Sequence, residues 1–264
     1  MELPHNLFKE RLTKPEPQIG SWLMSVSPLV TEAMGCVGFD FLVVDMEHCP
    51  VDLPQALSLL QVLAGTPTPP VLRVPWNDAV IVKRVLDVGA QSLMFPFIQT
   101  VDEARQAVAA TRYPPKGIRG VAGMNRAGRF GTVDDYVHKA ASELCVILQL
   151  ETPSAVALLP EIAALEGVDA IFIGPADLSA NMGLLGKIDD PKVQNALSAG
   201  AKAARQCGKP CGIIGQDAAT VQKYLDMGFT FVAMGSDVGL MMHQATLGLS
   251  ALRKGNKTSA TGAY

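Results

Sequence analysis

The chain has 264 residues, of which 48% are hydrophobic and 18% are charged, and its formal net charge at pH 7 is −3. This composition predicts a globular protein with a large core and argues against disorder. The charge provides no field that would attract nucleic acid, so we expect no nucleic-acid partner. We expect a single domain over residues 1–264, with an ordered core over about residues 6–253 and a flexible tail at residues 254–264.

Short apolar runs that predict β-strands recur along the chain. They lie at residues 18–24, 39–44, 70–75, 92–98, 145–151, 170–175, 211–215 and 229–235. Segments with helical periodicity separate nearly all of them, and most of these segments begin with Asp, Ser or Thr, which N-caps prefer. The predicted helices lie at residues 52–64, 78–88, 102–112, 153–165 and 217–227.

The junction from helix to strand has the same form four times. A glycine that ends a helix is followed by two residues and then by an apolar run, at Gly38, Gly89, Gly167 and Gly228. The strands are continuously apolar, which implies burial on both faces and therefore a parallel sheet covered by helices. Eight such units predict a (β/α)₈ TIM barrel. A doubly wound open sheet is the alternative, but the sequence has no Gly-rich dinucleotide fingerprint and no Walker A motif.

Nothing in the sequence indicates export or a membrane. No uncharged apolar stretch approaches about 20 residues, and the N-terminus lacks the apolar core of a signal peptide. The five cysteines form an odd set without the spacing of a disulfide framework, which is typical of reduced thiols. We therefore expect a cytoplasmic protein with no membrane partner.

Ionisable residues follow several of the apolar runs. Asp45, Glu47 and His48 follow the second run, and the third run contains Arg73. The neutral amide Gln149 and the carboxylate Glu151 lie at the end of the fifth run, and Asp177 lies just after the sixth. In a TIM barrel the carboxyl ends of the strands form the active-site face, so these side chains should converge on one mouth.

Two carboxylates of this set should lie close together. Gln149 and Glu151 are two residues apart, so their side chains lie on the same face of the strand. Both enter the mouth if that face points inward. Asp177 lies at the end of the neighbouring strand. A pair of carboxylates with open coordination positions suits Mg²⁺ or Mn²⁺. The alternative is that Arg73 neutralises one of them in a structural ion pair.

Two further features of the mouth have both a functional and a structural interpretation. In "GPADLS" the tight turn would direct the amides of Ala176 and Asp177 into the mouth, where they favour a carboxylate or phosphate, although a simple capping turn has the same pattern. His48 lies where a proton shuttle would be useful, although a lone histidine is often structural.

Several segments resemble a known family. They are "DMEHCP", "VLRVPWND", "TRYPPKGIRGV", "QLET", "EGVDAIFIGPADLS" and "MGFTFVAMGSD". In this order they resemble the class II (metal-dependent) pyruvate aldolases of the HpcH/HpaI type, which act on 4-hydroxy-2-oxoheptanedioate or 2-dehydro-3-deoxyglucarate. The segment "NRAGRFGTVDDY" is more similar to the sugar-acid branch.

The resemblance implies a reversible aldolase that cleaves 4-hydroxy-2-oxo acids, of the sugar-acid or dicarboxylic type, to pyruvate and an aldehyde or semialdehyde. It also implies a barrel of the phosphoenolpyruvate/pyruvate-binding type and a divalent cation, Mg²⁺, Mn²⁺ or Co²⁺. The expected assembly is a hexamer, a trimer of dimers, with C-terminal helices exchanged between subunits.

The resemblance assigns a role to each matching residue. His48 would be the acid/base residue, Asp87 would orient it, and Arg73 would contact the keto oxygen. The cation would be held by Glu151 and Asp177, and the pyruvate pocket would be formed by Trp22, Gln149, Gly174, Pro175 and Ala176. The sequence departs from the family where Met46 and Cys49 replace small residues, which puts the detailed substrate in doubt.

Retro-aldol cleavage requires a base for the C4 hydroxyl proton and stabilisation of the pyruvate enolate. A Schiff-base aldolase would instead use a lysine on a strand, and every lysine of the barrel region lies in a predicted helix or loop. Two alternatives remain open: a lyase that acts on coenzyme A thioesters, and a non-catalytic barrel that binds oxo acids.

Overall fold

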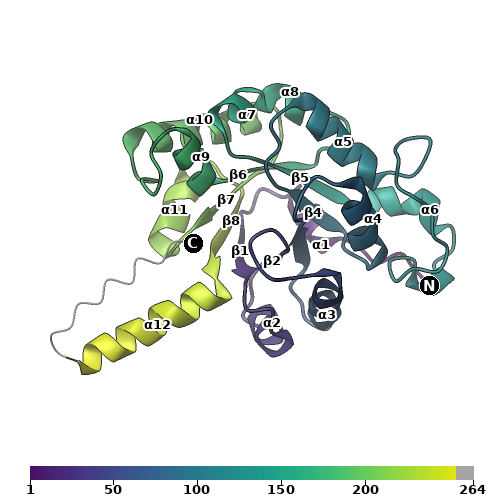
Figure 1. Cartoon of the computed structure of the whole chain (residues 1–264), viewed down its shortest axis with the longest axis horizontal. Coiled ribbons are helices and arrows are strands. Elements are labelled where there is room, and N and C mark those ends of the chain that lie inside the picture. Colours follow the sequence, from purple (N-terminus) through teal and green to yellow (C-terminus); the bar gives the residue numbers. More distant parts are fainter. Residues whose placement is uncertain (254–264) are drawn as a thin grey trace.

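The computed structural model describes residues 1–253, so the predicted tail at residues 254–264 lies outside the described residues. Parallel strands β1 to β8 pair in sequence order and close into a barrel (Figure 1). Their bounds are β1 Gln18–Leu23, β2 Phe41–Asp45, β3 Pro70–Arg73, β4 Ser92–Phe95, β5 Cys145–Leu150, β6 Ala170–Ile173, β7 Cys211–Gly215 and β8 Phe231–Ser236. The predicted (β/α)₈ fold is confirmed.

Helices surround the barrel on its outer side (Figure 1). The α-helices are α1 Leu7–Arg11, α2 Pro28–Gly35, α3 Leu53–Leu63, α4 Ala79–Asp87, α5 Val101–Thr111, α6 Tyr136–Lys139, α7 Pro153–Ala157, α8 Leu159–Ala163, α9 Pro175–Asn181, α10 Pro191–Gln206, α11 Ala218–Asp226 and α12 Asp237–Leu252. Short 3₁₀ helices cover Arg129–Gly131 and Ala140–Glu143. The Gly- and Pro-rich connection over residues 113–132 is mostly irregular.

One predicted helix is wrong in its extent. The segment 153–165 forms two short helices, α7 and α8, which meet at Leu158. Pro160 has no backbone N–H to donate, and its ring disfavours a continuous helix through the preceding turn. The segment is therefore helical on both sides of Leu158, as its periodicity predicted, but the proline interrupts the helix.

The four predicted junction glycines have the left-handed backbone that ends a helix. Their φ angles are 104° at Gly38, 99° at Gly89, 92° at Gly167 and 98° at Gly228. A residue with a Cβ is disfavoured in this region, which explains why glycine recurs at the helix-to-strand junction.

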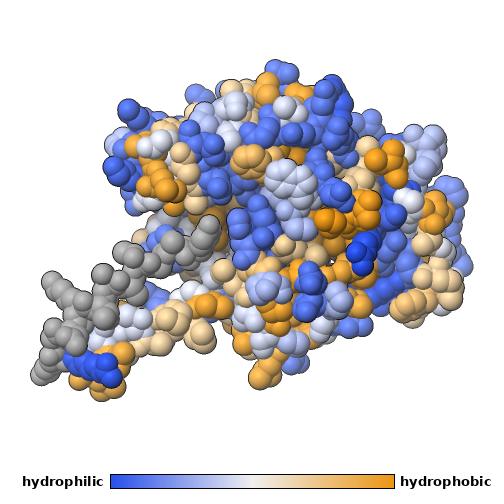
Figure 2. All heavy atoms as spheres, viewed as in Figure 1, coloured by the Kyte–Doolittle hydropathy of each residue, from blue (hydrophilic) through white to orange (hydrophobic). Residues whose placement is uncertain are grey.

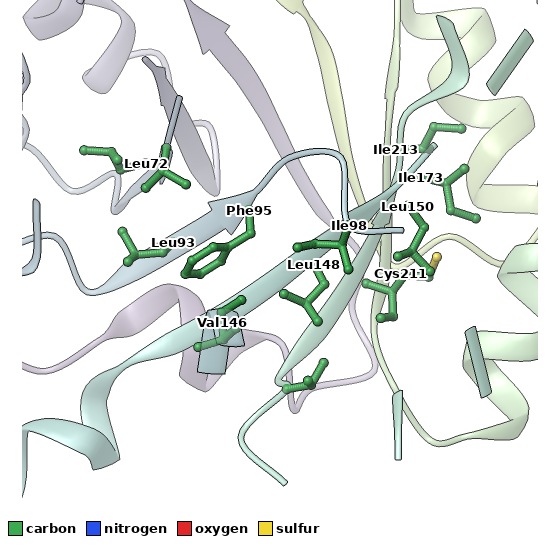
Figure 3. Packing of buried hydrophobic residues seen from close by; sticks show 14 of the residues in the cluster. Leu72, Leu93, Phe95, Ile98, Val146, Leu148, Leu150, Ile173, Cys211 and Ile213 are labelled. Carbon is green, nitrogen blue, oxygen red and sulfur yellow. The ribbon is translucent and has the colours of Figure 1, made fainter. Parts of the chain in front are cut away.

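The strands separate two buried apolar clusters. Alternate residues such as Phe41, Val43 and Ile147 fill the barrel interior, where Phe8 of α1 packs against Phe41 with ring centroids 5.2 Å apart. The residues between them face the helices, and they form the larger cluster, of which Figure 3 shows Leu148 and other residues packed together. This alternation determines which polar residues at the strand ends point into the barrel.

Helix α12 projects away from the barrel (Figure 1). Asp237 is the buried residue of this helix, and it lies at its first position. The exposed large apolar side chains along α12 are Met241, Met242, Leu247, Leu249 and Leu252, and orange apolar atoms are visible on it in Figure 2. Within residues 1–253, no helix has the length and apolar character needed to cross a membrane.

Candidate active site

Most of the predicted site residues meet at the carboxyl ends of the strands, around a cavity of about 1220 Å³. Its lining includes Trp22, Asp45, His48, Arg73, Gln149, Gly174, Pro175, Ala176 and Asp177. A smaller cavity, of about 240 Å³, lies at the amino ends of the strands and is lined by residues such as Pro70 and Gln91. None of the predicted site residues lines that second cavity.

Arg73 is held rigidly at the mouth by two acidic residues of the β2 end. Its Nε donates to Oδ1 of Asp45 at 2.8 Å, and its Nη2 donates to Oδ2 at 2.6 Å. Its Nη1 lies 2.9 Å from Oε2 of Glu47. Burial alone would raise the pKa of Asp45, but the Arg73 guanidinium outweighs it and the pKa is lowered overall. A bidentate pair of this kind fixes the plane of the guanidinium.

The alternative structural role of Arg73 is therefore only partly correct. Arg73 forms ion pairs, but with Asp45 and Glu47 rather than with Glu151 or Asp177. Its guanidinium carbon also lies 5.4 Å from the centroid of the Trp22 ring. The pairing with Asp45 follows from the strand register, because these two residues are direct partners across β2 and β3.

Glu151 is almost completely buried, at 2% exposure. Its Oε1 accepts a hydrogen bond from the backbone N–H of Phe97 at 2.8 Å, and its Oε2 accepts one from Nε2 of Gln149 at 2.6 Å. Burial raises the pKa of Glu151 to about 7. The hydrogen bond from Gln149 lowers this pKa, whereas the negative charges of Asp177 and Glu47 raise it further. The carboxyl group therefore lies near other negative charge.

Gly174 leaves room for the Glu151 carboxylate. A Cβ built at this position would overlap Oε2 of Glu151. Helix α9 begins directly afterwards with Pro175, and no side chain caps its N-terminus. Ala176 and Asp177, in the first turn, line the cavity. Backbone N–H groups in a first helical turn favour an anion.

The acidic pair fits a divalent cation. Glu151 and Asp177 are close enough to repel each other, and each oxygen of Glu151 has a lone pair beyond the one used in its hydrogen bond. A hard cation such as Mg²⁺ keeps several water ligands and is commonly bound by only one or two protein carboxylates. In the part of the chain that the structure describes, no group of three or more His, Cys, Asp or Glu side chains is arranged as a metal site, so the candidate is a site with two protein ligands.

His48 lies at the rim of the cavity, with its side chain 48% exposed. Its Nε2 is 3.7 Å from Oε1 of Glu47. Glu47 thus lies between Arg73 and His48 and contacts both side chains. The resemblance to the family gives these two residues separate roles, as keto-oxygen contact and as acid/base residue. The roles of Asp45 and Glu47 were not assigned from the sequence, although both lie within the "DMEH" motif.

Within this chain the structure does not bring Asp87 to His48, so the orienting role of Asp87 stays a prediction. This residue is the last of α4, and a helix that follows a strand in a barrel returns to the amino ends of the strands. Its Oδ1 accepts a hydrogen bond from Nη2 of the buried Arg119 at 2.8 Å. Asp87 therefore lies at the opposite end of the barrel from His48 and cannot orient the histidine of the same chain.

The fold and the site together define an enzyme of the (β/α)₈-barrel class, with its ionisable residues gathered at the carboxyl ends of the strands. The model of the HpcH/HpaI aldolase/citrate lyase family matches residues 18–244, and the chain belongs to this family. The predicted family is confirmed, and with it the expectation of a carbon–carbon lyase.

Individual relatives agree with this assignment. The chain is 46% identical to a 5-keto-4-deoxy-D-glucarate aldolase of Salmonella arizonae over 235 residues, which cover 89% of this chain and 92% of that protein. A crystal structure of an HpcH/HpaI aldolase/citrate lyase family protein from Burkholderia cenocepacia superposes with a TM-score of 0.91 at 40% identity, covering 94% of this chain and all of that one. An HpcH/HpaI aldolase from Desulfitobacterium hafniense gives a TM-score of 0.84 at 28% identity, covering 94% of this chain and 98% of that one.

Proposed function

We propose that this protein is a metal-dependent aldolase that reversibly cleaves 4-hydroxy-2-oxo acids to pyruvate and an aldehyde. The observation that carries the proposal is the Glu151 and Asp177 pair beside a fixed Arg73 at the mouth of the barrel. The similarity to the Salmonella aldolase supports 5-keto-4-deoxy-D-glucarate as the substrate. Its cleavage would give pyruvate and a three-carbon semialdehyde that retains the distal carboxylate.

Glu151 and Asp177 would hold the cation, which is Mg²⁺, Mn²⁺ or Co²⁺ in this proposal. When bound, a divalent cation acts as a Lewis acid and stabilises the negative charge of a pyruvate enolate. The hydrogen bonds from Phe97 and Gln149 keep the Glu151 carboxylate in place before the ligand arrives. Gly174 is required because a side chain there would displace that carboxylate.

The pyruvate half of the substrate would bind between β3 and α9. The first-turn amides of Ala176 and Asp177 would donate to its carboxylate, and Arg73 would donate to its keto oxygen. Because Asp45 already fixes the guanidinium, little reorganisation is needed when charge develops on that oxygen. Trp22, beneath Arg73, and Gln149 would form the rest of the pocket wall.

His48 would accept the proton of the C4 hydroxyl group. The C4–O bond then becomes a carbonyl, the C3–C4 bond breaks, and its electron pair passes to the enolate of pyruvate. The aldehyde leaves, and protonation of C3 gives pyruvate. His48 is half-exposed, which permits proton exchange with solvent, and its Nε2 lies 3.7 Å from Oε1 of Glu47.

The assembly would be a hexamer with α12 exchanged between subunits. In its own chain this helix buries little beyond Asp237, although much of its surface is apolar. An exposed apolar helix is stabilised by burial against a partner, and exchange of identical elements is a low-cost way to achieve it. Light scattering on the full chain gives the mass of the assembly.

A pyruvate-release assay tests the function. The protein is stripped of metal with EDTA and assayed on 5-keto-4-deoxy-D-glucarate and other 4-hydroxy-2-oxo acids, with and without added Mg²⁺, Mn²⁺ or Co²⁺. We expect activity that chelation abolishes and metal restores. Activity unaffected by chelation, or an adduct trapped by borohydride with pyruvate, would refute the metal-dependent mechanism. Coenzyme A thioesters serve as comparison substrates, and turnover of these alone would instead indicate the thioester lyase.

A further inference from the structure

Phe97 has a backbone conformation that its side chain disfavours. Its φ angle is 52°, in the left-handed region where a residue with a Cβ is uncommon. It lies two residues beyond the end of β4, between Pro96 and Ile98. Strained positions of this kind persist only where their surroundings hold them, and they cluster at functional sites.

The contacts of the next residue hold the Phe97 backbone, while the Phe97 ring has a separate neighbour. The next residue, Ile98, is fully buried and its N–H donates to the carbonyl oxygen of Gln149 at 3.1 Å. Figure 3 shows Ile98 next to Leu148 and Leu150 of β5. On the solvent side, the Phe97 ring stacks on Trp76, with centroids 6.1 Å apart and planes at 28°. The chain is therefore anchored to the core immediately after the strained residue.

The strained turn directs one polar group into the site. The N–H of Phe97 donates to Oε1 of Glu151 at 2.8 Å, while Gln149 donates to the other oxygen. With both oxygens engaged, the carboxylate cannot rotate freely about its last bond. Removing a partner that orients a metal ligand in this way typically lowers metal affinity by about 10–100-fold.

We propose that Phe97 is a positioning residue for Glu151: its left-handed backbone holds the carboxylate in the orientation that binds the divalent cation. This inference rests on the proposed function, because it assumes that Glu151 is a metal ligand. The ring of Phe97 is secondary to the conformation of its backbone. A residue that accepts the left-handed region should therefore preserve cation binding without the ring.

A series of substitutions separates backbone from ring. Phe97→Gly, Phe97→Ala and Phe97→Val all remove the ring and keep the N–H, but they accept the left-handed region in the order Gly, Ala, Val. Trp76→Ala removes the stacking partner of the Phe97 ring and leaves Phe97 itself in place. The affinity of the full-length, EDTA-stripped protein for Mn²⁺ alone is measured by calorimetry, with urea unfolding of each variant alongside.

We expect the Phe97→Gly protein to bind Mn²⁺ at least about tenfold more tightly than the Phe97→Val protein, with Phe97→Ala between them. The Trp76→Ala protein should bind within about twofold of the wild type. If the Phe97→Val protein does not fold, the comparison of Phe97→Gly with Phe97→Ala decides the question. Equal affinities across the Phe97 series would overturn the positioning role alone. A wild-type protein that binds no Mn²⁺ would instead overturn the metal-dependent function.

Discussion

Replacing Glu151 with glutamine should stabilise the metal-free protein at alkaline pH. Burial and neighbouring carboxylates raise the pKa of Glu151 from its ordinary value of 4.5 to about 7. Well below pH 4.5 the carboxyl group is protonated in both the folded and the unfolded protein, so its ionisation does not change the free energy of unfolding. Between these two pKa values only the unfolded protein ionises, and the free energy of unfolding falls as the pH rises.

The magnitude follows from the difference between the two pKa values. The difference of roughly 2.5, from about 7 to 4.5, corresponds to about 3 kcal/mol lost by the wild type above pH 7. Glutamine cannot ionise, but it has one acceptor oxygen where the carboxylate has two. It therefore loses one of the hydrogen bonds from Phe97 and Gln149, at a cost of about 1 kcal/mol. A net stabilisation of about 2 kcal/mol remains.

Urea unfolding in EDTA, near pH 4 and near pH 8, measures the effect. The Glu151→Gln protein should be more stable than the wild type near pH 8 and slightly less stable near pH 4. Glu16→Gln, at an exposed loop position, serves as the control and should change stability by less than about 0.5 kcal/mol. Added Mg²⁺ should stabilise the wild type near pH 8 and have little effect on Glu151→Gln. A Glu151→Gln protein that is less stable than the wild type at both pH values would refute the electrostatic reasoning.

Two other substitutions test the remaining parts of the mouth. Asp45→Ala should lower the free energy of unfolding, measured in urea, by about 3–5 kcal/mol. The buried Arg73 would lose its bidentate partner and keep only Glu47 as an acidic neighbour. A loss below about 1 kcal/mol would contradict a strong ion pair. Gly174→Ala should weaken Mn²⁺ binding measured by calorimetry, because its Cβ would overlap Oε2 of Glu151. Gly65→Ala, whose Cβ would meet its nearest atom at an ordinary 3.4 Å, should leave the affinity unchanged, and equal affinities for both variants would exclude the steric effect.

The barrel was predictable because several independent patterns in the sequence agree. Apolar runs of strand length, helical segments between them and glycines at the junctions all indicate repeated βα units, and the glycines have the left-handed backbone expected. Alternation along β5 also predicted that Gln149 and Glu151 share a face, and the two side chains form a hydrogen bond. Patterns of this kind depend only on the spacing of residues along one strand, and the sequence gives that spacing directly.

Contacts between strands were harder to predict. Asp45 pairs with Arg73 because β2 and β3 have a particular register, and nothing in either strand alone specifies that register. The strained backbone of Phe97 could not be inferred either, since local preference opposes it and the surrounding contacts override that preference. Asp87 is different. It lies at the end of a predicted helix, and this alone places it at the amino ends of the strands, away from His48 of the same chain.

The charges at the mouth explain why a cation would be needed there. Arg73 offsets the two acidic residues of the β2 end, Asp45 and Glu47, through direct ion pairs. Glu151 and Asp177 have no such partner among the described ion pairs, and their repulsion contributes to the raised pKa of Glu151. Near neutral pH the folded chain must therefore either protonate Glu151 or bind a cation beside it. In the proposed function the requirement for metal would arise from this uncompensated negative charge, so a neutral side chain at position 151 should remove both the proposed metal site and the instability that accompanies it.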